Sequence, residues 1–207
     1  MKSLKTFDQV KKCKLISFHI PLTVDSKFPT RNIIDANLLD NLESKIIINT
    51  SRGDIADETA ILNNKNITYI SDVWRNEPLP KIEIINHSLI STPHIAGYSY
   101  DGKINGTINL FKELFIFLGF NKDKQNKNNN FIKDFLGIKK INDYPKNISD
   151  YSESFDILKE SMDFKVLTKG CKNKLPAEIF LKKRSEHISR RDISVSYTHL
   201  RAHETES

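Results

Sequence analysis

Four apolar stretches, each about the length of a strand, divide the first 97 residues of the chain. They are rich in isoleucine and occupy residues 14–23, 45–54, 67–74 and 88–97. Continuous runs of this kind are typical of strands buried in a parallel sheet. Residues 31–44 and 54–64 lie between strands and carry apolar side chains at helical spacing. Asp35 and Asp57 stand where N-caps are expected. This alternation predicts an α/β fold with a parallel sheet and crossover helices. Residues 79–90 are interpreted as a loop that returns to the sheet edge.

The pattern changes beyond residue 97. Residues 98–120 contain the longest predicted helix, which has an apolar face and Gly119 at its end. Residues 121–130 have no apolar side chain and are predicted to be a linker. Residues 131–193 alternate charged and apolar segments, which predicts a second, smaller domain. No internal repeat is visible.

Composition narrows the class of protein. The formal net charge is +6, but the lysines are scattered and lack interleaved aromatics, so no nucleic-acid partner is expected. A genome rich in A and T explains the abundance of Lys, Asn and Ile. No apolar run approaches the roughly 20 residues of a membrane span, and the start lacks the apolar core of a signal peptide. Cys13 and Cys171 are too far apart for a CxxC metal pair or a disulfide framework. A cytoplasmic protein without membrane or metal partners is predicted.

Polar residues follow three of the predicted strands, namely Thr50–Arg52, Asp72 and His94. In parallel sheets, ligands bind beyond the carboxyl ends of the strands. Histidine exchanges a proton near neutral pH, and a neighbouring carboxylate such as Glu77 would orient its ring. A guanidinium such as that of Arg52 binds a carboxylate with two hydrogen bonds. Taken singly, such a histidine is more often structural, the arginine a surface charge and the glutamate a solvated loop acid, so the inference depends on their combination.

Three motifs contain these residues: "NTSRGD" contains Arg52, "DVWRNEP" contains Glu77, and "TPHIAGYS" contains His94. Glu77 and His94 are 17 positions apart. Together the motifs resemble the second half of the D-isomer-specific 2-hydroxyacid dehydrogenases, over roughly Leu4 to Ile193. The resemblance implies that residues 1–97 are the C-terminal half of an NAD-binding domain, a partial Rossmann-like sheet. Residues 98–120 would return to a substrate domain, and residues 131–193 would form a small α+β dimerisation domain.

The roles of the family's site residues can be assigned to the matching positions of this sequence. The resemblance implies that His94 is the acid/base on the C2 hydroxyl, that Glu77 is its partner, and that Arg52 holds the substrate carboxylate. Tyr98 would also contact substrate. The implied NAD contacts are Thr50, Ser51, Arg52, Asp72 and Gly97, with Asp72 facing the nicotinamide amide. Ile20 stands where the family has threonine, which leaves a contact only through its backbone.

Three further segments, "FHIPLT", "HIAGYSYDGKINGT" and the late "PAEIFLKKRSEHISRRDI", resemble one branch of this family. That branch oxidises 4-phospho-D-erythronate in pyridoxal phosphate (vitamin B6) biosynthesis and forms homodimers through an additional C-terminal domain. Two alternatives remain open. One is a different D-2-hydroxyacid dehydrogenase, and the other is a catalytically silent relative that senses dinucleotide or only mediates dimerisation.

Both ends of the sequence depart from the family. The chain has no GxGxxG motif, the turn that receives the cofactor's pyrophosphate, so we expect a fragment that folds poorly and is inactive alone. Residues 194–207, "SVSYTHLRAHETES", lose the Lys/Asn/Ile bias and resemble a translated sequencing adapter. The helical spacing of His199 and His203 is therefore not interpreted as a metal site.

Overall fold

The computed structural model describes residues 6–43, 46–119, 155–187 and 190, and the chain divides into two compact units. The first unit contains residues 1–96 and 156–186, and the second contains residues 97–155 and 187–207. The predicted linker and the adapter-like tail lie outside the described residues, as does the part of the predicted dimerisation domain before residue 155. The predicted domain boundaries remain a prediction.

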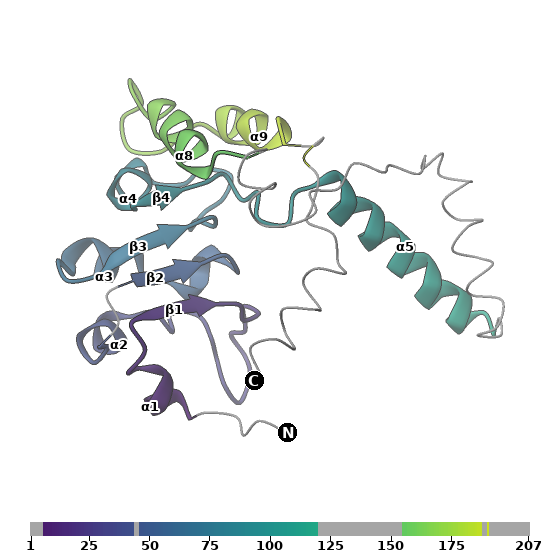
Figure 1. Ribbon diagram of the computed structural model, residues 1–207, viewed down its shortest axis with the longest axis horizontal. Coiled ribbons are helices and arrows are strands. Elements are labelled where there is room, and N and C mark those ends of the chain that lie inside the picture. The colour runs from purple at the N-terminus through teal and green to yellow at the C-terminus, as the bar shows by residue number, and fades with distance from the viewer. Residues whose placement is uncertain (1–5, 44–45, 120–154, 188–189, 191–207) are drawn as a thin grey trace. The chain divides into compact units, whose positions relative to one another are not determined.

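A four-stranded parallel sheet forms the centre of the first unit (Figure 1). Its strands follow one another in chain order: β1 (Leu15–Phe18), β2 (Ile46–Asn49), β3 (Thr68–Ser71) and β4 (Ile90–Ser91). Ile16 pairs with Ile47, and Ile48 pairs with Ile70. Since all four strands run the same way, their carboxyl ends meet at one edge. The predicted α/β class with a parallel sheet is confirmed.

Short crossover helices connect the strands. Asp35 caps α2 (Ala36–Asp40) by accepting from the Leu38 amide at 2.7 Å. Asp57 caps α3 (Glu58–Asn63) in the same way. Both predicted N-caps are confirmed, because a carboxylate there satisfies amides that have no partner within the helix. A 3-10 turn, η1 (Gly53–Ile55), precedes α3, and α1 (Phe7–Val10) precedes β1.

Residues 79–90 differ from the expectation of a loop, because they contain the helix α4 (Ile82–His87). Its N-cap, Lys81, makes no side-chain capping bond. The first helical amide, on Ile82, instead donates to the Asn173 carbonyl at 3.0 Å, which comes from a distant part of the chain. A tertiary contact therefore replaces the local signal that the sequence lacks.

Two later helices, α8 (Ile157–Val166) and α9 (Ala177–Ser185), belong to the same unit as the sheet. In Figure 1 they lie beside α4 and β4. The Ser91 amide of β4 donates to Ser161 Oγ of α8 at 2.9 Å. The Lys165 ammonium donates to the Ser88 carbonyl, and burial lowers the pKa of this lysine. Helix α8 therefore covers the outer edge of β4, which would otherwise expose an unpaired strand.

The core of the first unit lies between the sheet and these helices. Ile47, Ile61 and Ile84 are fully buried and come from β2, α3 and α4. The same cluster extends into α8 and α9 through the aromatic rings of Trp74, Phe164 and Phe180. The centroid of the Phe164 ring lies 6.1 Å from that of Trp74 and 6.0 Å from that of Phe180. A single core thus joins residues that are about a hundred positions apart.

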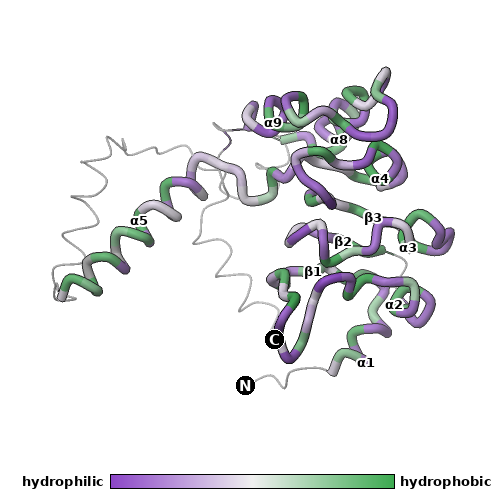
Figure 2. Tube along the Cα trace, turned by 180° about the vertical axis from the view of Figure 1, so that it is seen from behind, coloured by the Kyte–Doolittle hydropathy of each residue, from purple (hydrophilic) through white to green (hydrophobic). Residues whose placement is uncertain are grey.

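The second unit contains the long helix α5 (Tyr100–Phe117), as predicted. Ser99 caps it by accepting from the Gly102 amide, and Gly119, just beyond its end, has a φ of 77°. Hydrophobic and hydrophilic patches alternate along α5 (Figure 2). Among the described residues, no helix is long and apolar enough to cross a membrane.

Candidate active site

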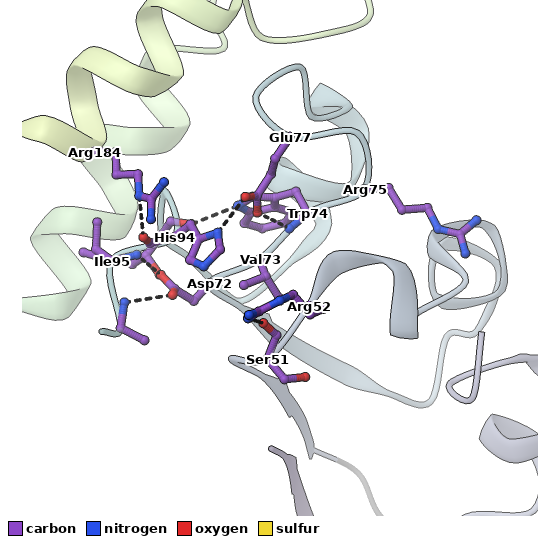
Figure 3. Close-up of polar contacts among 12 residues, drawn as sticks. Ser51, Arg52, Asp72, Val73, Trp74, Arg75, Glu77, His94, Ile95 and Arg184 are labelled. Atoms are coloured by element: carbon purple, nitrogen blue, oxygen red, sulfur yellow. Dashed lines mark hydrogen bonds and ion pairs between the residues drawn. The ribbon is translucent and has the colours of Figure 1, made fainter. Parts of the chain in front are cut away.

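His94 and Glu77 form a close pair at the carboxyl edge of the sheet (Figure 3). The distance from His94 Nδ1 to Glu77 Oε2 is 2.6 Å. The two side chains are 28% and 21% exposed, so the pair is shielded yet open to a ligand. Since a carboxylate only accepts hydrogen bonds, His94 Nδ1 is the donor and Nε2 is left to exchange a proton.

The loop after β3 fixes Glu77. Its second oxygen, Oε1, accepts from the Trp74 amide at 2.7 Å. The Trp74 indole in turn donates from Nε1 to the Thr92 carbonyl at 2.9 Å, two residues before His94. The loop that carries Glu77 is therefore attached to the strand end that carries His94.

His94 has a left-handed backbone, with a φ of 57°. For a residue other than glycine this conformation costs roughly 1–2 kcal/mol, so its surroundings must stabilise it. Asp72 does so from one side. Its Oδ1 accepts from the Thr92 hydroxyl at 2.6 Å and the Ile95 amide at 2.8 Å, and its Oδ2 accepts from the Ala96 amide at 2.8 Å.

Arg184 of α9 binds the same loop. Its Nε donates to the His94 carbonyl at 2.9 Å, across 90 positions of sequence. Figure 3 shows Arg184 and Asp72 both bound to the backbone around His94. No local pattern in the sequence identified Arg184.

Arg52 belongs to the turn that follows β2. Asn49, fully buried, donates from Nδ2 to the Arg52 carbonyl at 3.0 Å and accepts from the Ser51 amide at 3.1 Å. Asn49 also contacts the Tyr69 hydroxyl, and burial raises the pKa of Tyr69 to about 12, so this phenol stays protonated. The guanidinium of Arg52 donates one bond, from Nη1 to the Ser51 carbonyl at 2.6 Å.

Gly53 brings the turn of Arg52 against the loop of Glu77. A Cβ at position 53 would lie 2.0 Å from the Trp74 carbonyl carbon and oxygen. Only glycine permits such a close approach of two backbones. Asn49, Gly53, Trp74 and Arg184 all organise the site, and sequence reasoning missed all four. The position of Gly53 directly after Arg52 was the available signal.

The predicted cofactor contacts of the first unit lie at this same edge. Ser51 is buried, and the Thr50 hydroxyl lies 3.3 Å from His19 Nδ1. Ile20 packs against the core, which is compatible with the expected backbone contact. Asp72 uses three of the roughly four acceptor positions of a carboxylate on the chain's own donors. Of these three bonds, Oδ2 accepts one, from the Ala96 amide.

Gly97 and Tyr98 belong to the second unit. There the Lys103 ammonium lies 3.8 Å from the centre of the Tyr98 ring, a cation–π contact. Their predicted roles towards cofactor and substrate remain predictions, as do those of the other site residues.

The comparison with protein families finds a match to the first part of the chain. Residues 2–96 match the family described as "D-isomer specific 2-hydroxyacid dehydrogenase, NAD binding domain". This part of the chain is therefore similar to the NAD-binding domain of that family. The resemblance of the motifs around Arg52, Glu77 and His94 and the predicted cofactor class, NAD, are thereby confirmed.

Several curated relatives share one name. The chain is 42% identical over 141 residues to "Erythronate-4-phosphate dehydrogenase" of Wigglesworthia glossinidia brevipalpis, which covers 66% of this chain and 35% of the relative. It is 37% identical over 123 residues to the protein of that name from Hahella chejuensis, covering 57% of this chain and 32% of the relative. The chain thus spans about a third of the length of these relatives.

Parts of solved structures are also similar. They include an NAD-dependent formate dehydrogenase from Staphylococcus aureus in complex with NAD, at 26% identity and a TM-score of 0.40, covering 45% of this chain and 29% of that chain. A glyoxylate reductase from Paecilomyes thermophila has 25% identity and a TM-score of 0.42, covering 47% of this chain and 31% of that chain.

Proposed function

We propose that the chain carries the acid/base half of an NAD-dependent dehydrogenase that oxidises 4-phospho-D-erythronate to 2-oxo-3-hydroxy-4-phosphobutanoate. The observation that carries this proposal is the 2.6 Å contact between His94 Nδ1 and Glu77 Oε2 at the carboxyl edge of a parallel sheet. The names of the relatives support this choice of substrate over other 2-hydroxy acids.

Proton transfer follows from the geometry of the pair. With Nδ1 donating to Glu77, the neutral ring presents Nε2 as a base towards the C2 hydroxyl of the substrate. When Nε2 takes the hydroxyl proton, the ring becomes an imidazolium, and the adjacent Glu77 carboxylate stabilises that charge. In the reverse direction His94 returns the proton to the C2 oxygen.

Arg52 binds the substrate carboxylate in this proposal. The Ser51 carbonyl uses one of its five N–H groups, which leaves a fork of donors for two parallel bonds to a carboxylate. The anchoring of the turn by Asn49 and Gly53 limits the freedom of this side chain at its backbone.

A bound NAD would supply the acceptor for the hydride that leaves C2. On this chain the hydroxyls of Thr50 and Ser51 and the Asp72 carboxylate would hold its nicotinamide half. Homodimer formation, a cytoplasmic location and a place in pyridoxal phosphate biosynthesis are predictions that come with the family resemblance.

The test uses a hybrid enzyme, in which this chain replaces the aligned segment of the Wigglesworthia relative. The relative supplies the parts that this chain does not span. We expect NADH to form with 4-phospho-D-erythronate, and much more slowly with D-lactate or D-glycerate. A hybrid that melts cooperatively and binds NAD, yet forms no NADH, would be a silent dinucleotide-binding relative and would refute the enzyme function.

The decisive variant is His94→Ala. Removing a general base lowers turnover by about 100- to 10,000-fold, while NAD affinity should stay within about twofold because the imidazole acts on substrate. His87→Ala, at the exposed end of α4, is the matched control and should keep full activity. Retained turnover in His94→Ala contradicts the acid/base role.

A further inference from the structure

We propose that Arg184 is a positioning residue, through which helix α9 holds the backbone of His94 and keeps its imidazole aligned with Glu77. The inference rests on the proposed function, because it assigns a support to the proton-transfer pair. It also ties the late part of the chain, residues 156–186, to the chemistry at the sheet edge.

The bond that carries the inference ends on one particular peptide group. Arg184 Nε donates to the His94 carbonyl at 2.9 Å, and Asp72 Oδ1 accepts from the Ile95 amide at 2.8 Å. That carbonyl and that amide belong to the same peptide unit. Because a peptide unit is planar, fixing both of its ends fixes its orientation. A cation holds one end and an anion the other, and charge-assisted bonds of this kind are about twice as strong as neutral ones.

This peptide unit needs such a clamp because His94 is left-handed, with a φ of 57°. Without support the backbone would relax towards the extended or right-handed regions that residues other than glycine prefer. A rotation about His94 would carry its side chain away from Glu77, whose oxygen lies only 2.6 Å from Nδ1. The alignment of the pair therefore depends on the peptide that Arg184 holds.

Arg184 is itself firmly held. The preceding residue, Lys183, pairs with Glu160 of α8 at 2.9 Å, and these side chains are only 11% and 8% exposed. Burial acts to lower the pKa of Lys183, but hydrogen bonds to Glu160 and Glu186 outweigh it, so the pKa lies above its usual value. Lys183 therefore stays charged, and the ion pair persists at neutral pH.

The same pair of helices supports Glu77. Phe180 of α9 packs on Phe164 of α8, which packs on the Trp74 ring. The Trp74 amide donates to Glu77 Oε1. Helices α8 and α9 thus reach His94 through Arg184 and reach Glu77 through Trp74, so they act on both partners of the proton-transfer pair.

The test compares Arg184→Gln and Arg184→Lys in the hybrid enzyme. Misplacing a catalytic group by about 1 Å can cost about 100-fold, so Arg184→Gln should lower kcat by roughly 10- to 100-fold. The KM for NAD should change less than twofold. Arg184→Lys keeps a cation that can reach the His94 carbonyl and should recover most of kcat. Lys182→Gln, an exposed position on the same helix, removes the same charge and should have no effect.

A spectroscopic measurement separates this inference from the proposed function. In the full chain, NMR should show a far-downfield proton for the hydrogen bond between His94 Nδ1 and Glu77. That signal should disappear in Arg184→Gln and return in Arg184→Lys. If it does so while the hybrid lacks turnover, the positioning role holds and the enzyme function fails. If Arg184→Gln keeps both the signal and a kcat within twofold of the parent, or if Arg184→Lys recovers neither, the positioning role is wrong.

Discussion

Glu58 shows how one buried carboxyl can make the stability of the fold depend on pH. Its Oε1 accepts from the Arg75 amide at 2.9 Å, while the buried Oε2 has no hydrogen-bond partner among the described residues. Burial raises the pKa of Glu58 above the usual 4.5, although the Arg75 bond and the charges of Lys81 and Arg75 oppose it. The folded chain therefore keeps this proton to a higher pH than the unfolded chain does.

The sign of the effect follows from proton binding. Above pH 4.5, and up to the raised pKa, the folded state binds more protons at Glu58 than the unfolded state. The free energy of unfolding that Glu58 contributes therefore falls as pH rises through this window. Glu58→Gln removes the titration, so the stability of the parent minus that of the variant should decline from pH 4.5 upwards. Urea titrations followed by the fluorescence of Trp74, the single tryptophan, measure this difference.

The control is Glu83→Gln, which neutralises an exposed carboxyl on α4. Because this side chain is exposed, the variant gives the baseline for replacing a carboxyl with an amide on the surface. Parallel curves for the parent and Glu58→Gln would mean that the Glu58 carboxyl is not protonated preferentially in the folded state.

Glu77 gives a second prediction at the scale of one residue. Glu77→Gln keeps the size of the side chain but removes the negative charge beside His94, which in the proposed mechanism stabilises the imidazolium. We expect turnover of the hybrid enzyme to fall by roughly 10- to 1,000-fold, with less than a twofold change in NAD affinity. Steady-state kinetics and fluorescence titration with NAD separate the two quantities. Unchanged turnover would show that proton transfer by His94 does not need the carboxylate charge.

At the scale of elements, the contact between the turn after β2 and the loop after β3 depends on one glycine. Gly53→Ala would place a Cβ 2.0 Å from the Trp74 carbonyl, so one of the two backbones must move. We expect a loss of about 1–3 kcal/mol of stability, together with reduced turnover, because Arg52 and Glu77 flank this contact. Thermal melts and kinetics of the hybrid enzyme measure both.

Gly106→Ala is the matched control. Gly106 lies within α5, where an added Cβ would meet nothing within 4 Å. The same substitution there should stabilise the helix by about 0.5–1 kcal/mol, because alanine favours helix over glycine. Equal effects at positions 53 and 106 would contradict the close approach at Gly53.

The same elements show what the sequence could and could not predict. Strands β1 to β3 and the caps Asp35 and Asp57 were predicted because their signals are local: β-branched runs and a carboxylate before a helix. Helix α4 was not predicted, since its first amide is satisfied by Asn173 rather than by a capping side chain.

The candidate site likewise contains residues that the sequence could predict and residues that it could not. His94 and Glu77 could be paired from their motifs, and the structure brings them to 2.6 Å. The supports of the pair could not be predicted. Arg184 reaches His94 across 90 positions, and Gly53 matters only because Trp74 folds against it. Contacts of this range leave no periodicity in the sequence, so only the fold reveals them.

At the scale of the whole molecule, the first unit is discontinuous in sequence, since residues 156–186 complete a core begun by residues 1–96. Backbone hydrogen bonds also join the two segments of this unit. The Leu175 amide donates to the Pro80 carbonyl at 2.9 Å, and the Ile82 amide donates to Asn173. A unit built this way should unfold as one body, because neither part keeps its buried apolar surface alone.

Phe164→Ala tests that cooperativity. The side chain is fully buried and lies between Trp74 and Phe180, so its loss should cost about 3–5 kcal/mol. If the unit is one body, the loss of α8 packing must also destabilise the loop of Trp74. Melts followed by Trp74 fluorescence and by far-ultraviolet circular dichroism should then shift to lower temperature together.

The control is Met162→Ala, on the same helix but 66% exposed, which should change stability by no more than about 0.5 kcal/mol. The contrary result in Phe164→Ala would be an unchanged midpoint of the Trp74 fluorescence transition together with a separate, earlier loss of helical circular dichroism. That result would mean that α8 and α9 fold independently of the sheet. In that case Arg184 could not hold His94 as the folded unit loosens, and the support of the proton-transfer pair would have to come from Asp72 alone.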